Sequence, residues 1–209
     1  KYVRDLLASF RCCLKAALVG ANRAIWRMRP VTGRRLQFIV YCTNTDCAMR
    51  IALYQPDIPQ NTGTILRLGV CLGVPIDIIE PAGFSLSDKA LKRAGLDYLT
   101  HLDMHRHESF AAFDTWRQQQ GCRLVLLTTA AAQRYAEAAF APTDILLLGR
   151  ESVGVPREVH AQADLSVRIP MQPGMRSLNG AVAGAMVLGE ALRQTGQLPV
   201  EPVRSGATD

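Results

Sequence analysis

From residue 50 onward the chain alternates short apolar segments with amphipathic ones, and this alternation limits the fold more than any other feature. Apolar segments of strand length lie at 50–54, 76–80, 123–128, 144–148 and 165–169. Segments with helical periodicity lie at 62–72, 87–94, 109–119 and 178–194, with a helical turn after Pro156. Because parallel strands are joined by crossover helices, the pattern predicts an α/β domain with a mostly parallel sheet flanked by helices.

The positive charge of the chain is concentrated in its first 48 residues. Nine lysines and arginines oppose two acidic residues there, a net charge of +7, whereas residues 49–209 carry fifteen basic and sixteen acidic residues, a net charge of −1. The overall net charge of +6 therefore does not describe the globular part. Any site for a polyanion in that part must be a local patch.

Residues 1–48 are interpreted as a basic leader. Apolar residues recur in it at helical spacing with arginines between them, which is typical of a mitochondrial transit peptide. We favour a simpler interpretation, in which the globular sequence begins at Met49 and the leader is a disordered or non-native extension. The expected organisation is then the leader, one domain at 49–195 and a flexible tail at 196–209.

Three loops follow strands at the edge of the expected sheet where open α/β sheets bind their ligands. They occupy 126–130, 148–156 and 169–180 and are rich in small residues. Loops of this kind offer backbone amides and few charges, which suits a nucleoside-sized ligand. There is no GxGxxG fingerprint, and Gly149 and Gly154 have the spacing of a phosphate-binding loop without its lysine. For Gly149–Pro156 alone, an ordinary strand-to-helix turn is at least as good an interpretation.

A fourth segment, QPDIPQNTGTILR at 55–67, joins the first strand of the domain to its first helix. Two prolines stiffen it, Asn61 can cap the helix, and Arg67 follows one turn into the helix. An isolated helical arginine is usually solvated. The position of Arg67 near the end of a strand makes it a candidate to face an anionic substrate.

The histidines and cysteines predict no metal site. The chain has neither a CxxC pair nor a Cys/His cluster with zinc-ligand spacing, and we interpret HLDMHRHE at 101–108 as a surface connection. No apolar run is long enough to span a bilayer, so no membrane partner is expected. The cysteine pattern favours a reducing compartment, and the expected location is the cytoplasm.

The closing helix at 178–194 is rich in small residues. Gly180 and Gly184 lie four residues apart, as do Ala181 and Ala185, so another backbone can approach closely. Glycine inside a helix costs about 1 kcal/mol relative to alanine. The glycines therefore indicate tight packing, either at a subunit contact or in a crowded core.

Four motifs occur in order and at consistent spacing: PDIPQNTGTILRL, IIEPAGFSLSDKALKRAGLDY, LLLGRESVGVP and RIPMQPGMRSLN. Together they resemble the SPOUT methyltransferase superfamily. Within it, they are most similar to the small tRNA (cytidine/uridine) 2′-O-methyltransferases that act on the wobble nucleoside, position 34 in the anticodon loop. The resemblance covers about residues 50–195 and leaves the leader without a counterpart.

This resemblance implies a deep trefoil knot at the C-terminal end of the sheet, with S-adenosylmethionine bound in the knot and no metal. It also implies a homodimer with the closing helix in its interface. Asn61 and Arg67 match positions associated with the catalytic site. The cofactor pocket is assigned to Leu127, Thr128, Gly149, Glu151, Gly154, Ile169, Met171, Ser177, Leu178 and Asn179.

The implied partner is tRNA, bound through its anticodon stem-loop. Basic residues expected to contact it, together with Arg67, are Lys89, Lys92, Arg93 and Arg150. A guanidinium stays protonated in proteins, so Arg67 suits a different task from accepting a proton. Its expected role is to hold a phosphate and stabilise the developing alkoxide.

Two positions depart from the pattern of the superfamily. Ala181 and Val182 stand where many relatives carry a hydroxyl residue and a further polar residue, so substrate positioning by those side chains is in question. The alternatives are a SPOUT methyltransferase that acts on another RNA site and an RNA-binding module without activity. A Rossmann-type oxidoreductase would share the sheet, but the chain lacks its glycine fingerprint and acidic ribose ligand.

Overall fold

The structure is a computed structural model that describes residues 25–31, 35–41, 48–86 and 102–200. The chain divides into two compact units, Lys1–Cys47 and Ala48–Asp209. In the first unit, β1 (Ile25–Val31) and β2 (Arg35–Tyr41) pair antiparallel. The second unit holds every element discussed below. The helix expected at 87–94 lies outside the described residues.

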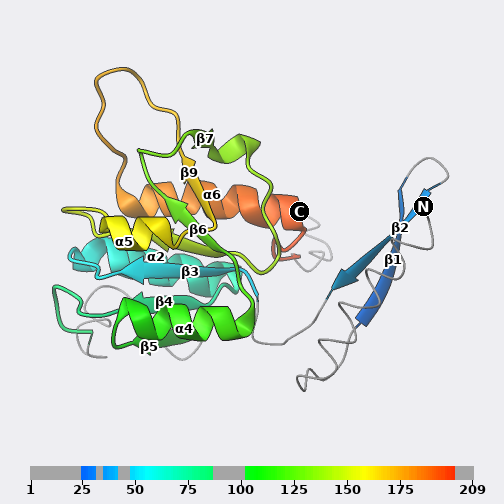
Figure 1. Ribbon diagram of the computed structural model, residues 1–209, viewed down its shortest axis with the longest axis horizontal. Helices are drawn as coiled ribbons and strands as arrows, with labels where there is room; N and C mark the ends of the chain where they lie inside the picture. The colour runs from blue at the N-terminus through cyan, green and yellow to red at the C-terminus, as the bar shows by residue number, and fades with distance from the viewer. Residues whose placement is uncertain (1–24, 32–34, 42–47, 87–101, 201–209) are drawn as a thin grey trace, which may run out of the picture. The chain divides into compact units, whose positions relative to one another are not determined.

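A seven-stranded sheet forms the centre of the second unit (Figure 1). Its strands are β3 (Arg50–Tyr54), β4 (Ile76–Ile79), β5 (Met104–His107), β6 (Leu124–Leu127), β7 (Gln133–Arg134), β8 (Ile145–Leu148) and β9 (Leu165–Arg168). Their order across the sheet is β5-β4-β3-β8-β6-β9-β7, and every neighbouring pair is parallel. The predicted parallel sheet is confirmed.

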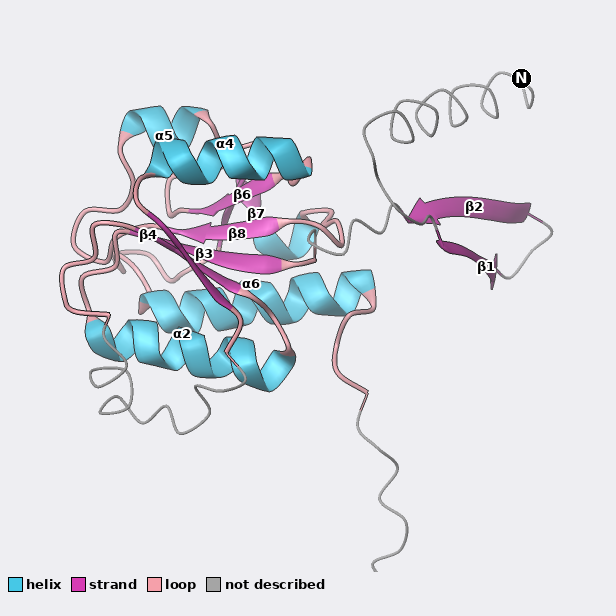
Figure 2. Cartoon of the chain, turned by 90° about the horizontal axis from the view of Figure 1, so that it is seen from below, coloured by secondary structure: helices cyan, strands magenta, loops and turns pink. Residues whose placement is uncertain are grey.

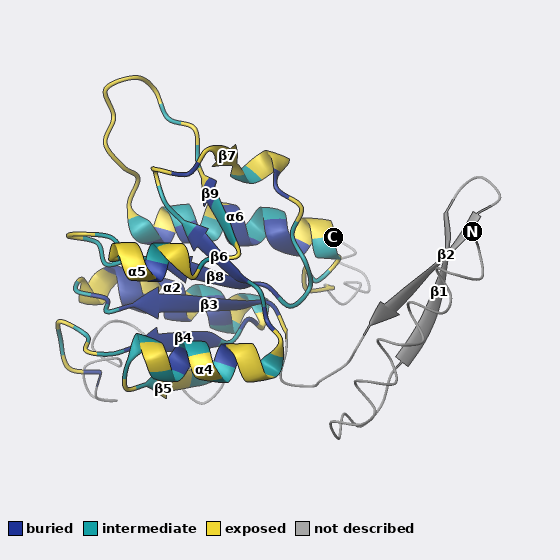
Figure 3. Cartoon of the chain, in the orientation of Figure 1, coloured by how far each residue is buried: buried dark blue, intermediate teal, exposed yellow. Residues whose placement is uncertain are grey.

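Helices cover both faces of this sheet, as the sequence predicts (Figure 2). On one face α2 (Pro59–Leu72) packs beside α6 (Gly180–Thr195), and on the other lie α4 (Phe110–Gln120) and α5 (Arg157–Ala161). A short 3-10 turn, η2 (Tyr135–Glu137), follows β7. Because the central strands are buried on both faces, they have nearly continuous apolar sequences (Figure 3).

Local sequence signals explain where the long helices begin and end. Pro59 opens α2, where its missing N–H would have had no helical partner. Ser109 caps α4 by accepting from the Ala112 N–H at 3.2 Å, and the Asn179 Oδ1 caps α6 by accepting from the Ala181 N–H at 2.9 Å. Each of these helices ends before a glycine in the left-handed conformation.

A buried ionic cluster joins β3, β4 and β5. The Arg50 Nε donates to the Asp77 Oδ2 at 2.7 Å, and the His107 Nε2 lies 2.8 Å from the Asp77 Oδ1. Arg50 and Asp77 are both buried, and the guanidinium lies over the Trp116 ring of α4 at 5.2 Å. We call Arg50, Asp77, His107 and Trp116 the Asp77 cluster. Each charge in it faces a partner.

Two further arginines, Arg123 and Arg117, form ion pairs near the amino ends of the strands. The Arg123 Nε and Nη2 donate to the two carboxylate oxygens of Asp144 at 2.8 and 2.7 Å. The Arg117 guanidinium donates to Asp164 at 2.9 Å and to Asp114 at 2.6 Å. Since Arg123, Asp144 and Asp164 directly precede β6, β8 and β9, these pairs hold the starts of the strands together.

The 101–108 segment corrects the sequence-based interpretation. It was expected to be a surface connection, but Met104–His107 forms β5, which pairs with β4 at one edge of the sheet. An edge strand is only partly buried, so the apolar pattern of a central strand is absent from MHRH. The two-residue β7 at the opposite edge was not expected either. The other expected elements that the structure describes begin and end within three residues of their predicted bounds.

Candidate functional site

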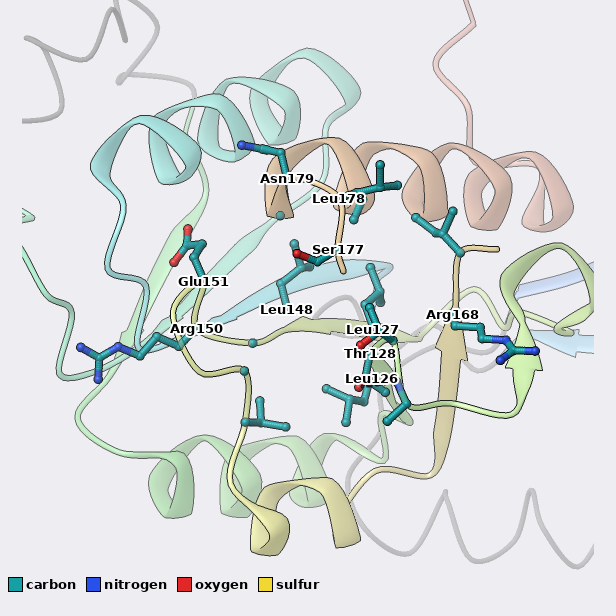
Figure 4. A pocket seen from close by; sticks show the side chains of 18 of the residues that line it. Leu126, Leu127, Thr128, Leu148, Arg150, Glu151, Arg168, Ser177, Leu178 and Asn179 are labelled. Carbon is teal, nitrogen blue, oxygen red and sulfur yellow. Dashed lines mark hydrogen bonds between the residues drawn. The ribbon is translucent and has the colours of Figure 1, made fainter. Parts of the chain in front are cut away.

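A cavity of about 720 Å³ opens at the carboxyl ends of β6, β8 and β9 (Figure 4). It is lined by the segments 126–130, 148–151, 153–155, 167–169 and 177–180, with Ile58, Asn61, His160, Met171, Ala183 and Val187. Its walls thus come from the ends of three neighbouring strands, the start of α2 and the first turns of α6. This is the edge at which open α/β sheets bind ligands.

The structure brings most of the predicted site residues together. All ten residues assigned to the cofactor line the cavity, and so do Asn61 and Arg150. Arg67 is exposed on α2 and does not belong to the lining. Lys89, Lys92 and Arg93 lie outside the described residues.

The 149–155 loop closes tightly on itself. The Gly154 N–H donates to the Arg150 carbonyl at 2.7 Å, and the Arg150 N–H donates to the Gly154 carbonyl at 3.1 Å. A Cβ on Gly149 would come within 2.9 Å of the carbonyl carbon of Gly154, so this closure requires glycine at position 149. The loop is therefore more constrained than the ordinary turn that its sequence left open.

Gly184 allows α6 to cross close to the end of β8. A Cβ at this position would come within 2.9 Å of the Leu148 Cδ2. Of the two explanations for the small residues of this helix, a crowded core therefore applies to Gly184. The close approach brings the start of α6 over the cavity, which Leu148 lines from below.

Three polar side chains join the 149–155 loop, α2 and α6 at the cavity. The Asn179 Nδ2 donates to the Asn61 Oδ1 at 2.8 Å, and the Asn61 Nδ2 donates to the Glu151 Oε1 at 3.2 Å. The backbone N–H of Asp57 donates to the Glu151 Oε2 at 3.1 Å. Figure 4 shows Glu151 and Asn179 directed toward the α2 side of the cavity. Because each amide is held at both ends, the orientation of Asn61 is fixed.

Asp57 is a site residue that the sequence did not single out. Its Oδ2 accepts from the Arg150 Nε at 3.0 Å and from the Ser152 hydroxyl. Hydrogen bonding with Glu151, Ser152 and Arg150 holds the pKa of Asp57 well below its usual range, so the carboxylate is charged. Arg150 and Ser152 lie 93 and 95 residues away along the chain, and no local pattern reveals such contacts.

Other lining residues were also missed, although a signal for them existed. Val155, Val167 and Arg168 belong to β9 or to the loop after β8. Their place beside the carboxyl end of a strand is what brings them to the cavity. Arg168 is exposed at its rim. The strand pattern could have predicted these contacts, whereas the motifs alone did not.

No metal site or membrane helix is found within the residues that the structure describes. No group of three His, Cys, Asp or Glu residues there could hold a metal ion. Two of the histidines of the 101–108 segment instead contact carboxylates, His105 that of Asp103 and His107 that of Asp77. None of the described helices is long and apolar enough to cross a membrane.

A parallel sheet whose last strands carry a ligand cavity at their carboxyl ends matches the SPOUT methyltransferases. Residues 48–189 match the model of the SpoU rRNA Methylase family, and the chain belongs to this family. The resemblance drawn from the motifs is confirmed, and the C-terminal trefoil knot is a property that family membership implies. The chain is therefore a methyltransferase of the SpoU type.

Individual proteins that are similar to this chain give more detail than the family model. A tRNA (cytidine(34)-2′-O)-methyltransferase from Beijerinckia indica is 63% identical over 148 residues, which cover 71% of this chain and 92% of that protein. A solved structure concerned with the 2-OH methylation of C/U34 on tRNA is 44% identical, with a TM-score of 0.66 over 70% of this chain and 95% of that one. The SpoU methyltransferase AviRb from Streptomyces viridochromogenes, in complex with the cofactor AdoMet, is 25% identical, with a TM-score of 0.65 over 71% of this chain and 60% of that one. SpoU methyltransferases thus bind S-adenosylmethionine.

Proposed function

We propose that this enzyme transfers a methyl group from S-adenosylmethionine to the ribose 2′-hydroxyl of nucleotide 34, cytidine or uridine, in the anticodon loop of tRNA. The observation that carries the proposal is the meeting of Asn61, Glu151 and Asn179 at the cavity that all ten cofactor residues line. The relatives at 63% and 44% identity, both concerned with position 34, support the choice of substrate. A cytoplasmic location is proposed with it.

The cavity suits S-adenosylmethionine. Its volume of about 720 Å³ falls within the range of small-molecule sites. Apolar strand ends such as Leu127 and Ile169 would hold the adenine ring, and the backbone at Gly149 can approach a ligand closely because it carries no side chain. When bound, the cofactor supplies a methyl group already activated on sulfonium, so the proposed transfer needs no metal.

Asn61 and Arg67 of α2 are the proposed catalytic residues. Asn61 is buried, and its amide keeps one further donor and one further acceptor site, so it can orient a ribose hydroxyl without turning. Arg67 follows it by six residues, about 9 Å along the helix axis. From that exposed position its guanidinium can hold a phosphate and stabilise the alkoxide as it forms.

A substitution at Arg67 tests the shape of this contact. Arg67→Lys keeps the charge and loses the planar fork, so we expect about tenfold lower turnover of tRNA with unchanged binding of S-adenosylmethionine. Steady-state kinetics and calorimetry measure the two effects. Near-normal turnover would contradict a role for the fork.

The proposed RNA contacts are Arg67, Lys89, Lys92, Arg93 and Arg150. The Arg150 side chain is 38% exposed and lies beside the cavity. Because the globular part carries a net charge near zero, we expect binding that depends on geometry and shows a shallow salt dependence. A homodimer would double the number of these basic groups.

A second copy of the chain is the proposed partner of α6. Val182 and Met186 lie four residues apart, are 51% and 39% exposed, and therefore share one helix face. Leu178, which is 40% exposed, extends this apolar stripe toward the cavity. An exposed apolar stripe of this kind favours a subunit interface. Val182 in place of a polar residue makes the stripe more apolar than in many relatives.

In the direct test, the purified protein is incubated with labelled S-adenosylmethionine and an anticodon stem-loop. The stem-loop carries C34, U34 or a 2′-deoxy nucleotide at position 34. We expect methyl incorporation into the first two and none into the third, with the modified ribose identified by nucleoside mass spectrometry. Methylation at another nucleotide would assign the enzyme to a different RNA site. Cofactor and RNA binding without incorporation would indicate an inactive RNA-binding module. Intact wobble methylation in cells that lack the protein would overturn the assignment.

A further inference from the structure

Asp57 connects the segment after β3 to the loop after β8. Its Oδ2 receives two hydrogen bonds from that loop, from the Arg150 Nε at 3.0 Å and from the Ser152 hydroxyl. We call Asp57, Arg150 and Ser152 the Asp57 clasp. The clasp lies beside the cavity. Of its three residues only Arg150 was assigned a role from the sequence, as an RNA contact, whereas Asp57 and Ser152 were assigned none.

Two unfavourable features accompany this clasp. The Asp57 Oδ1 is buried and has no hydrogen-bond partner, although the carboxylate is charged. Gln55, two residues earlier, has a φ of 45°, a left-handed conformation that is uncommon for residues other than glycine. Unpaired buried groups and strained backbone both cost free energy and tend to persist where function requires them.

The geometry of Arg150 indicates which ligand the clasp could help to bind. Among the described residues, the carboxylate of Asp57 is the only acceptor of a hydrogen bond from the Arg150 side chain, and it engages only Nε. The two terminal nitrogens of the guanidinium remain on a side chain that is 38% exposed. Figure 4 shows Arg150 pointing away from the interior of the cavity. A guanidinium held in this way presents a planar pair of donors, which matches a phosphate.

We infer that Asp57 is a positioning residue for tRNA, which holds Arg150 through Nε so that its outer donors meet a backbone phosphate of the anticodon loop. This inference rests on the proposed function. It adds that the contact depends on a carboxylate, a group that on charge alone would repel RNA.

Because the Asp57 Oδ1 makes no hydrogen bond, the clasp leaves the Arg150 guanidinium some freedom to rotate toward RNA. A fully paired carboxylate would lock the arginine in a bidentate pair and leave it less able to rotate toward RNA. A single contact through Oδ2 aims the guanidinium and leaves its outer edge available. The cofactor side is expected to depend little on the charge of Asp57, because the Glu151 Oε2 accepts from the backbone N–H of Asp57, which Asp57→Asn retains.

The sign of one measurement separates positioning from simple electrostatics. Asp57→Asn keeps the size of the side chain and removes a negative charge, so charge alone predicts tighter RNA binding. Positioning predicts the opposite, about tenfold weaker binding of a C34 anticodon stem-loop with a matching rise in KM. We expect kcat to stay within about twofold and the affinity for S-adenosylmethionine to be unchanged. Fluorescence anisotropy, steady-state kinetics and calorimetry give the three values.

A double-mutant cycle tests whether Asp57 acts through Arg150. Arg150→Gln should weaken stem-loop binding, and adding Asp57→Asn to it should cause no further loss. Ser152→Ala removes the other donor to the same oxygen and should change binding by less than about twofold. The matched control is Glu137→Gln, which removes the carboxylate from the exposed Arg134–Glu137 pair and should not weaken binding.

Three results would overturn the inference. They are equal or tighter stem-loop binding by Asp57→Asn, additive losses in the cycle, and a loss of cofactor affinity as large as the loss of RNA affinity. The last would show a structural role for the loop. If the unmodified enzyme itself fails to methylate position 34, the proposed function fails and the inference falls with it. Normal methylation by the unmodified enzyme, with an unchanged KM for the stem-loop in Asp57→Asn, would overturn only the inference.

Discussion

Charged side chains are paired differently at the two ends of the parallel strands, which we call the amino edge and the carboxyl edge of the sheet. At the amino edge, Arg123 and Asp144 join the starts of β6 and β8, and Arg50 at the start of β3 pairs with Asp77 of β4, which His107 of β5 also contacts. Each of these charged groups has a partner. At the carboxyl edge, the described part of the chain contains one buried side-chain atom without a hydrogen bond, the Asp57 Oδ1, and it lies beside the cavity.

This difference indicates a division of labour along each strand. Charges at the amino edge are satisfied within the protein, so their loss should reduce stability. Groups at the carboxyl edge are held by a few contacts and face a cavity, so their loss should reduce binding or turnover while the fold persists. Substitutions at each edge can break this distinction or sharpen it.

The largest effect on stability is expected at Asp77. Asp77→Ala removes the partner of the buried Arg50 and of His107, and it should reduce the free energy of unfolding by about 3–5 kcal/mol. Urea denaturation measures the loss. Asp103→Asn, in an exposed pair with His105, is the control and should cost less than about 0.5 kcal/mol. A similar cost for both substitutions would remove the distinction between cluster and surface.

The largest effect on the cavity is expected at Gly149. Gly149→Ala would place a methyl group within 2.9 Å of the Gly154 carbonyl carbon. Overpacking of this kind costs about 1–3 kcal/mol, so binding of S-adenosylmethionine should weaken by about ten- to hundredfold as the loop shifts. Calorimetry measures the affinity. Gly189→Ala in α6, where a Cβ would meet nothing within 4 Å, should leave it unchanged.

A smaller effect is expected from Glu151→Gln. The amide accepts at one oxygen only, so either the Asp57 N–H or the Asn61 Nδ2 loses its acceptor. We expect kcat/KM to fall about tenfold, while the urea midpoint changes little. Glu158→Gln on the exposed surface of α5 is the matched control. If Glu151→Gln lowered only the urea midpoint and left kcat/KM unchanged, Glu151 would have a structural role like that of the charges at the amino edge.

The smallest effect is expected at Glu190, far from both kinds of site. Hydrogen bonding with Arg193 lowers its pKa to about 2 from 4.5, so the pair favours the folded state above pH 4.5 and this contribution is lost as the pH falls from 4.5 toward 2. Because the pair is exposed, solvent and salt screen it. Glu190→Gln should leave the unfolding midpoint at pH 7 unchanged within error. A clear shift would mean that a surface ion pair can matter as much as a buried one.

Much of the fold could be predicted because the central strands are buried on both faces. Segments such as Ile145–Leu148 carry continuous apolar sequence, and α2 is bounded by Pro59 and Gly73. The suggestion that Asn61 caps α2 was wrong, because the helix already begins at Pro59 and Asn61 lies in its first turn. The edge strand Met104–His107 could not be predicted in this way. Its residues are only partly buried, and its pairing with β4 depends on contacts that no local periodicity records.

The candidate site also has a part that the sequence predicts and a part that it does not. The ten cofactor residues were assigned through motifs, and the rule for parallel sheets explains why they share one edge. The Asp57 clasp and the Asp77 cluster join residues that are far apart in the chain, so they appear only when the strands are ordered. Arg150 was expected to contact RNA, but its attachment to a carboxylate was not foreseen.

The hydrogen bond between Asn61 and Asn179 spans 118 residues and has a consequence for protein synthesis. The ribosome releases α2 and most of the sheet well before it releases α6. A nascent chain can therefore form strands before the cavity has its final wall. The cavity is then complete only after α6 has been synthesised, and a chain that lacks α6 would lose buried core residues such as Val187 and Leu188 together with that wall.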